Sequence, residues 1–176
     1  EELMQLKAAG LDMVYMGIES GDPQVLKDVK KGVTREEMIE AGRKLKRCGI
    51  LCSATLISGL GGRQRLREHA IASASLISAI KPDYVGFLTL MIDPQAPVYS
   101  KIVSGELELL NPEDVVEEMK LFLENVDSEG TVFRSNHASN YVILKGTLNE
   151  DIPSMLAYLR QVEEQGKYRE ERWRRF

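Results

Sequence analysis

Cysteine is scarce in this sequence: Cys48 and Cys52 are the two among 176 residues. Two thiols make neither a disulfide framework nor a four-cysteine metal site, and C-x3-C spacing alone holds no zinc ion or iron–sulfur cluster. We therefore expect both to be packed, reduced thiols and expect no metal site in this chain. A reduced, cytoplasmic setting fits this cysteine usage.

Long apolar runs are missing as well. No stretch approaches the roughly 20 residues that a membrane-spanning helix needs, and no signal peptide opens the chain at Glu1. With 43% hydrophobic residues, 28% charged residues and a formal net charge of -4, the composition is that of one globular domain. We expect no membrane partner, and the acidic balance argues against a nucleic-acid partner.

Strand and helix signals alternate along the chain. Such alternation, at intervals of about 30 to 45 residues, predicts a parallel sheet that is either open and doubly wound or closed as a barrel. A complete (β/α) barrel takes about 250 residues, so four or five units would make half of one. The apolar runs that predict strands are residues 13–18, 52–57, 84–90 and 131–133.

We expect two regions in this chain. Residues 1–150 would form a partial (β/α) barrel with parallel strands, and residues 151–176 a C-terminal helix and a charged tail. The tail, residues 167–176, is dense in charges of both signs and predicts a solvated terminal helix.

Two of the strand ends carry candidate binding residues. Glu19 follows the first predicted strand, where a carboxylate is costly unless it faces water or a polar ligand; it suits the vicinal hydroxyls of a ribose. Alternatively, Glu19 caps the next helix or pairs with Lys31. Residues 59–62, GLGG, follow the second strand, and their glycines let a ligand approach the main chain. They form neither G-x-G-x-x-G nor a P-loop.

Polar residues later in the chain have two interpretations each. Arg134, Asn136, His137 and Asn140 follow the fourth predicted strand and would contact substrate on the rim of a barrel, with Arg134 suited to a carboxylate or phosphate. Alternatively, they form a turn whose Asn and Ser side chains bond its own backbone. His69, in the first turn of a predicted helix, is either a base or metal ligand, or a surface or helix-packing residue.

Three strand segments resemble, in order, those of one enzyme family. YMGIESGD (15–22), followed by KGVT (31–34), resembles the fourth-strand region of radical S-adenosylmethionine (radical SAM) enzymes, in the group of oxygen-independent coproporphyrinogen oxidases and tRNA methylthiotransferases. ATLISGLGG (54–62) resembles their fifth strand and LTLM (88–91) their sixth, while FRSNHASNY (133–141) is similar to a segment of one uncharacterised bacterial branch. The chain thus resembles the C-terminal half of a radical SAM barrel.

The resemblance implies that all three strand ends bind S-adenosylmethionine. The first would bind the ribose hydroxyls and the methionine carboxylate, the second would face adenine with main-chain groups, and the third would pack on the ring. In this order, the implied residues are Glu19 and Lys31, Ile57 and Gly59, and Leu90 and Met91.

Two features of the family are absent from this sequence. The family's fifth strand begins with Gly and ends with Glu, whereas this chain has Thr55 and Gly62 there. The C-x3-C-x2-C loop that holds the 4Fe–4S cluster is also missing. The resemblance implies an oxidoreductase that, at full length, reductively cleaves S-adenosylmethionine to a 5′-deoxyadenosyl radical. We expect this chain alone to carry no cofactor and no activity, and its catalytic residues stay unassigned.

Two other functions remain open. The chain is either a different (β/α) enzyme that uses Glu19 and His137 as acid and base on a small substrate, or a non-catalytic module that binds a partner. A half barrel leaves the strand at residues 13–18 without a neighbour, and unpaired strand edges associate. We therefore expect a homodimer through this edge, or an edge covered by the chain's own termini.

Overall fold

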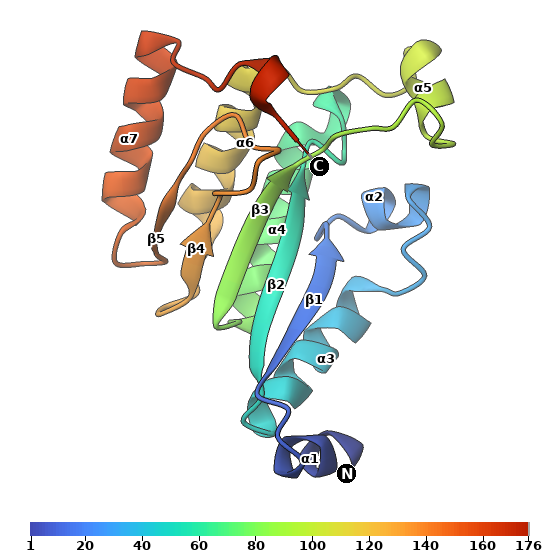
Figure 1. Cartoon of the computed structure of the whole chain (residues 1–176), viewed down its shortest axis with the longest axis vertical. Helices are drawn as coiled ribbons and strands as arrows, with labels where there is room; N and C mark the ends of the chain where they lie inside the picture. The colour runs from blue at the N-terminus through green and yellow to red at the C-terminus, as the bar shows by residue number, and fades with distance from the viewer. Residues whose placement is uncertain (176) are drawn as a thin grey trace.

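A computed structural model describes residues 1–175 of the chain. Its five strands form a single sheet in the order β1-β2-β3-β4-β5, in which β1 to β4 are parallel and β5 is antiparallel to β4 (Figure 1). The predicted α/β fold with parallel strands is confirmed. The strands are β1 Met13–Glu19, β2 Leu51–Ser58, β3 Tyr84–Thr89, β4 Val132–Arg134 and β5 Lys145–Thr147.

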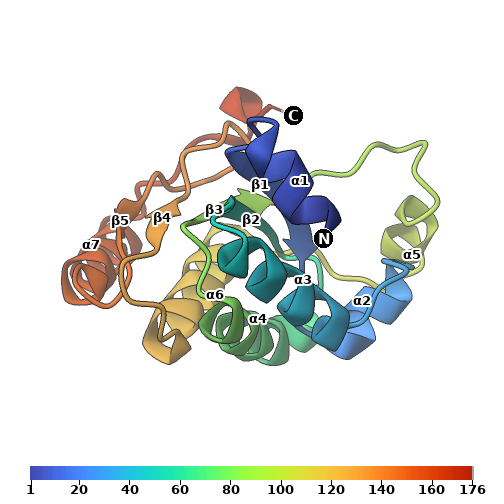
Figure 2. The same cartoon turned by 90° about the horizontal axis from the view of Figure 1, so that it is seen from below.

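Four helices, α3, α4, α6 and α7, cover one face of the sheet, and none of them lies on the other face (Figure 2). This one-sided covering is the arrangement of a barrel wall, whose bare face would line the barrel interior. The helices are α1 Glu2–Ala8, α2 Pro23–Asp28, α3 Arg35–Arg47, α4 Leu66–Ile80, α5 Tyr99–Val103, α6 Pro112–Asn125 and α7 Ile152–Gln165, with 3-10 helices η1 Arg63–Arg65 and η2 Glu171–Trp173.

One hydrophobic core fills the space between the sheet and these helices. Side chains alternate along each strand, so that Leu56 of β2 is fully buried while its neighbour Thr55 lies on the bare face and stays partly exposed. Phe87, Phe122 and Phe133, from β3, α6 and β4, pack together with ring centroids 4.7 to 6.0 Å apart. These contacts hold the last parallel strand against the helical layer.

The C-terminal region packs onto the same body. Helix α7 inserts Met155, Leu159 and Val162 into the core. The tail does not form the solvated helix that its charges predict: it runs over the carboxyl end of β3 and includes the short helix η2 (Figure 1). Arg174 is 6% exposed because it bonds to main-chain carbonyl groups, a contact that a charge pattern does not reveal.

The helix starts agree with local sequence signals, whereas β5 has none. Thr34 and Asn111 begin α3 and α6 through capping boxes, in which each side chain accepts from the residue three positions later. Strand β5 consists of Lys145–Thr147 and has no apolar run, so only its pairing with β4 defines it. Among the described residues, none of the helices has the length and hydrophobicity that crossing a bilayer requires.

The turn after β1 lies against the backbone of α4. A Cβ atom on Gly21 would lie 2.3 Å from the carbonyl oxygen of Ala72. The Gly21 N–H donates to Ser73 Oγ at 2.9 Å. This position therefore needs glycine, and the contact sets how the first strand end sits on the helical layer.

We expect Gly21→Ala to lower the free energy of unfolding by about 2 kcal/mol, because the added methyl group meets helix backbone rather than a movable side chain. The measurement is urea denaturation followed by circular dichroism. Gly86→Ala is the matched control, since a Cβ there would have its nearest neighbour at 4.0 Å. Equal stability of the two variants would contradict the close approach.

Candidate functional site

The carboxyl ends of β1, β2 and β3 meet at one edge of the sheet, because the three strands are adjacent and parallel. Glu19 ends β1, Gly59 follows β2 and Leu90 follows β3. The Leu90 N–H donates to Ser58 O at 2.9 Å, and a Cβ on Gly59 would lie 3.7 Å from that of Leu90. The structure therefore brings the three predicted strand ends to a common rim.

Glu19 occupies an unusual backbone conformation. The register of β1 slips at a bulge between Gly17 and Glu19, and Glu19 has a φ of 65°, in the left-handed region. Its carboxylate lies over Gly17, where a Cβ would be 2.3 Å from Oε1, and the Lys31 Nζ is 3.4 Å from the same oxygen. Glu19 thus pairs with Lys31, while Asp22 caps α2 by accepting from the Gln24 N–H. Strained residues of this kind concentrate at functional sites.

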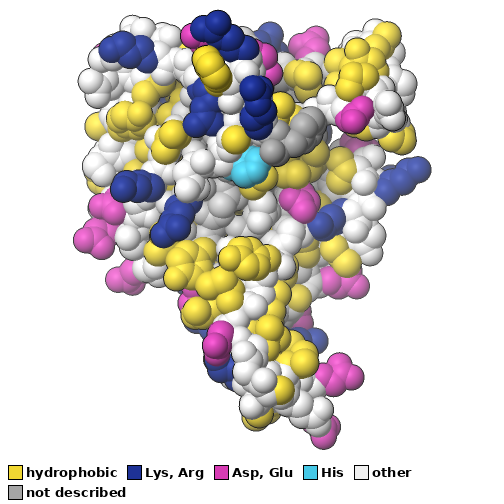
Figure 3. Space-filling model, in the orientation of Figure 1, with side chains coloured by type: hydrophobic (Ala, Val, Ile, Leu, Met, Phe, Trp, Pro, Cys, Tyr) yellow, Lys and Arg dark blue, Asp and Glu magenta, His cyan; other side chains and the backbone are white. Residues whose placement is uncertain are grey.

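The bare face of the sheet below this rim is made of small residues. Gly17 lies opposite Thr55, and Thr55 lies opposite Gly86. Above this row, Ile57 lies opposite Leu88 and gives the rim an apolar surface. Figure 3 shows hydrophobic side chains on this face of the molecule. A glycine within a strand often marks a close approach of a ligand, so this face suits a flat apolar group.

The turn after β2 is bound from two sides. Arg63 Nε donates to Asp114 Oδ2, on α6, at 2.9 Å. Arg65 Nε donates to Asp22 Oδ2, at the start of α2, at 2.8 Å. Gly59 has a φ of 82°, a conformation that glycine adopts without strain. The turn is therefore held in one conformation.

Two cavities open at the rim. The smaller, of about 340 Å³, is bordered by Ser58 and Gly59 of the β2 turn, by Leu90 and Met91, and by the C-terminal tail. The larger, of about 630 Å³, lies between α2 and α5 and also borders Leu90. Both volumes fall in the range of small-molecule sites.

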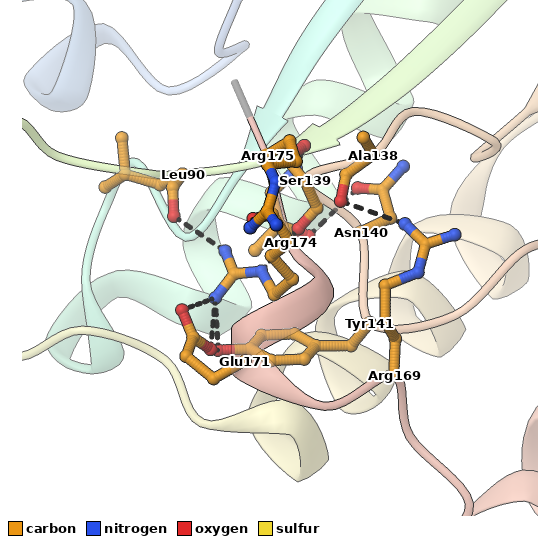
Figure 4. Close-up of polar contacts among 10 residues, drawn as sticks. Leu90, Ala138, Ser139, Asn140, Tyr141, Arg169, Glu171, Arg174 and Arg175 are labelled. Atoms are coloured by element: carbon orange, nitrogen blue, oxygen red, sulfur yellow. Dashed lines mark hydrogen bonds and ion pairs between the residues drawn. The ribbon is translucent and has the colours of Figure 1, made fainter.

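The tail closes the smaller cavity through Arg174 (Figure 4). Arg174 Nε donates to Ser139 O at 2.6 Å and Nη2 to Leu90 O at 3.2 Å, while the guanidinium lies 4.0 Å from the centroid of the Tyr141 ring. Burial, followed by the hydrogen bond with Glu171, raises the pKa of Tyr141 to about 12. Burial raises the pKa of Glu171, but hydrogen bonds from Arg174 and Tyr141 outweigh it and hold that pKa below its ordinary value. The sequence predicted no role for this segment.

The predicted substrate residues lie on the β4–β5 hairpin. Arg134 is exposed and lies opposite Lys145 across the two strands. Like charges directly opposite each other destabilise a sheet, and within residues 1–175 neither cation has a carboxylate oxygen within 4.0 Å. Asn136 is exposed beside them. The pair leaves uncompensated positive charge on this part of the surface.

His137 and Asn140 have different roles. The Ser139 N–H donates to His137 Nδ1 at 3.2 Å, and Ser139 Oγ lies 2.9 Å from the same atom. Nδ1 is therefore an acceptor, which places the ring proton on Nε2. Asn140 is fully buried and ties the hairpin to β3 through Phe87 O at 2.8 Å. His137 thus bonds within its own turn, whereas the Asn140 side chain bonds to the neighbouring strand.

The cysteines lie away from the rim. Cys48 caps the carboxyl end of α3, and Cys52 is buried near the amino end of β2. Burial, followed by the charge of Asp83, raises the pKa of the Cys52 thiol to about 11. No group of three His, Cys, Asp or Glu side chains suited to a metal ion occurs in the described part of the chain. The residues present do not fit an iron–sulfur cluster.

We expect Cys52 to react with Ellman's reagent at pH 8 about a hundredfold more slowly than an ordinary thiol, because its thiolate is correspondingly rarer. Cys48, at the surface end of α3, reacts in the native state. Absorbance in native buffer and in guanidinium chloride counts the two thiols. Two rapidly reacting thiols in native protein would contradict the burial of Cys52.

Comparisons with known proteins agree with these motifs. Residues 1–71 match the family model of the radical SAM superfamily. The chain is 27% identical over 104 residues to an uncharacterized methyltransferase of Pyrococcus horikoshii, covering 59% of this chain and 22% of that protein. It is 38% identical over 58 residues to a Methanocaldococcus jannaschii protein that carries the name methylthiotransferase, covering 32% of this chain and 13% of that protein.

A solved structure shares the fold. The archaeal Elp3 of Methanocaldococcus infernus, with an N-terminal deletion, superposes with a TM-score of 0.65 at 21% identity. The match covers 94% of this chain and 39% of that chain. The family match over residues 1–71 and the named relatives support the resemblance to the radical SAM superfamily that the strand motifs predict, and the solved structure shows a shared fold. The chain spans less than half the length of each of these relatives.

Proposed function

We propose that this chain forms one wall of the S-adenosylmethionine site of a radical SAM oxidoreductase. The observation that supports it is the common rim formed by Glu19, the Gly59 turn and Leu90 at the ends of three adjacent parallel strands. When bound, S-adenosylmethionine supplies the carbon–sulfur bond whose reductive cleavage gives the 5′-deoxyadenosyl radical. The chain's own residues bind and orient it.

Each strand end has a separate task in this proposal. The Glu19 carboxylate accepts hydrogen bonds from the ribose hydroxyls, and Gly17, with no side chain, leaves it room. Lys31, already beside Glu19, pairs with the methionine carboxylate. At the end of β2, main-chain groups of Ile57 and Gly59 face adenine. After β3, Leu90 or Met91 packs against the adenine ring.

The radical chemistry belongs to a longer protein in this proposal. Cluster ligation takes thiolates, and Cys48 and Cys52 lie at the amino end of the sheet, away from the rim. The described residues therefore bind the nucleoside part and leave cluster and electron supply to other segments. The two unpaired thiols support a reducing compartment, which we propose is the cytoplasm.

The substrate would approach over the β4–β5 hairpin. Arg134 and Lys145, uncompensated by any carboxylate of the described chain, suit a carboxylate or phosphate group of the substrate. His137 adds an N–H donor, and Asn136 an exposed amide. These residues are proposed as substrate contacts, separate from the cofactor rim.

The rival acid–base function is disfavoured by distance. Glu19 ends β1 and His137 follows β4, so three strand spacings separate them. At about 4.8 Å per spacing they lie about 14 Å apart along the sheet. A general acid and a general base within hydrogen-bond reach of one small substrate are much closer than this.

We also propose that the isolated chain pairs with a second copy through β1. Within residues 1–175, β1 has β2 as its sole strand partner, and neither terminus pairs with its free edge. An adjacent groove of about 440 Å³ is apolar at Val14 and Met16. Its rim carries Glu37 and Lys44, so that a copy related by a two-fold axis would present complementary charges.

We expect the chain to bind S-adenosylhomocysteine, and Glu19→Gln to weaken that binding about tenfold, since a hydrogen bond to a charged group contributes about 1.5–3 kcal/mol. Gly17→Ala should weaken it similarly by displacing the Glu19 carboxylate. Isothermal titration calorimetry measures both. Glu36→Gln, an exposed carboxylate on α3, is the control and should bind as the unmodified chain does. Unchanged affinity of the first two variants would refute the assigned role of Glu19.

We expect light scattering after size-exclusion chromatography to show a dimer at concentrations near 100 μM, a mid-range value for weak interfaces. Tyr15→Lys should give a monomer, because a charge placed on an edge strand opposes pairing; Tyr15 is 79% exposed, so the fold should tolerate it. Tyr158→Lys, on α7, is the control and should remain dimeric. If the unmodified chain is monomeric, the proposed pairing of two copies through β1 is wrong.

A further inference from the structure

A buried carboxylate lies directly behind the turn that follows β2. Glu118, on α6, is 1% exposed. Its Oε2 accepts a hydrogen bond from Ser58 Oγ at 2.5 Å and another from the Gly59 N–H at 2.9 Å. Its Oε1 lies 2.9 Å from His69 Nδ1, on α4. The three groups that bond to the carboxylate belong to buried residues, so water does not compete for it.

Packing alone does not account for a carboxylate at this position. Val115, Met119 and Phe122 lie on the same face of α6 and are 0–1% exposed, so an apolar side chain would complete the stripe. Burying a carboxylate costs several kcal/mol, which only well-formed hydrogen bonds offset. What Glu118 provides beyond packing is therefore the fixed geometry of its bonds to the turn.

His69 orients this carboxylate. A carboxylate oxygen accepts, so Nδ1 carries the ring proton and donates to Glu118. His69 Nε2 is buried without a hydrogen-bond partner within the described chain, and as a lone pair it is less costly there than an unpaired N–H. The histidine thus has one fixed tautomer and one partner. It acts on the turn through Glu118.

The bonds of Glu118 lead to the smaller cavity. Ser58 and Gly59 border that cavity together with Leu90. The carbonyl of Ser58 accepts from the Leu90 N–H at 2.9 Å, while its hydroxyl donates to Glu118. Any movement of the carboxylate is therefore transmitted to two segments of the cavity wall.

We propose that Glu118 is a positioning residue, which fixes the main chain of Ser58 and Gly59 as the wall against which the adenine of a bound nucleoside lies. This inference depends on the proposed function, because that function assigns the nucleoside to the rim. The carboxylate reaches the turn from α6, a helix about 60 residues further along the chain.

The test compares Glu118→Gln with the unmodified 176-residue chain. Glutamine keeps the shape but replaces one accepting oxygen by an NH₂ group, so it cannot accept from both the turn and His69. We expect amide hydrogen exchange at Gly59, followed by NMR, to accelerate at least tenfold. The affinity for S-adenosylhomocysteine, measured by calorimetry, should fall about tenfold. Ser58→Ala, which leaves the carboxylate in place, should shift both quantities in the same direction by about threefold.

The control is Glu117→Gln, an adjacent exposed carboxylate on α6 that pairs with Lys120. It should change neither quantity. If Glu118→Gln leaves both the amide exchange rate of Gly59 and the affinity for S-adenosylhomocysteine unchanged, the positioning role is wrong. If Glu118→Gln does not fold, Ser58→Ala decides: unmodified values in this variant overturn the role as well. If the unmodified chain does not bind S-adenosylhomocysteine, the proposed function is wrong. The amide exchange rate of Gly59 would still show whether Glu118 fixes the turn.

Discussion

The parallel pairing of β1, β2 and β3 is the constraint on which the rest of the structure depends. Backbone hydrogen bonds fix the register in which Gly17, Thr55 and Gly86 lie in one row, so the three strand ends emerge at one edge. In a parallel sheet this edge is where the connections to the next helices begin and where ligands bind. The small side chains of the row leave the face below the rim open.

Segments far apart in the sequence hold this rim in place. Helix α6 binds the β2 turn through Asp114 at the surface and Glu118 in the interior. The start of α2 binds it through Asp22, and the tail reaches the loop after β3 through Arg174. The glycine turn after β2 is thus held from two sides, by α6 and by the start of α2, while Arg174 holds the neighbouring loop after β3. The tail, which its charges suggest is solvated, is one of these supports.

The rim of strand ends and the two thiols lie far apart in this chain. The rim provides a carboxylate, main-chain groups and apolar surface, which together suit a nucleoside. The thiols lie at the other end of the sheet, and one is buried with its pKa raised. Within residues 1–175, the outer edge of β1 has no strand partner and one face of the sheet carries no helix of the α3, α4, α6 and α7 layer.

Local signals determined much of the fold. Apolar runs located β1 to β4, and capping residues such as Thr34 and Asn111 located helix starts, because both depend on neighbours within a few positions. The motifs around Glu19, Gly59 and Leu90 also indicated one family and one rim. The sequence left open whether Glu19 caps the next helix or pairs with Lys31. The structure shows the ion pair with Lys31, next to the bulge between Gly17 and Glu19.

Tertiary structure alone decided the supports of the site. Glu118 occurs at helical spacing among Val115, Met119 and Phe122, a signal that marks a polar residue on an apolar face but not its partners. Strand β5 and the docking of Arg174 likewise depend on contacts across tens of residues. By itself, the sequence determined where strands β1 to β4 and the capped helices lie along the chain, because periodicity and capping are local. Which buried charges meet is decided only when distant segments pack, since those hydrogen bonds have no counterpart along the chain.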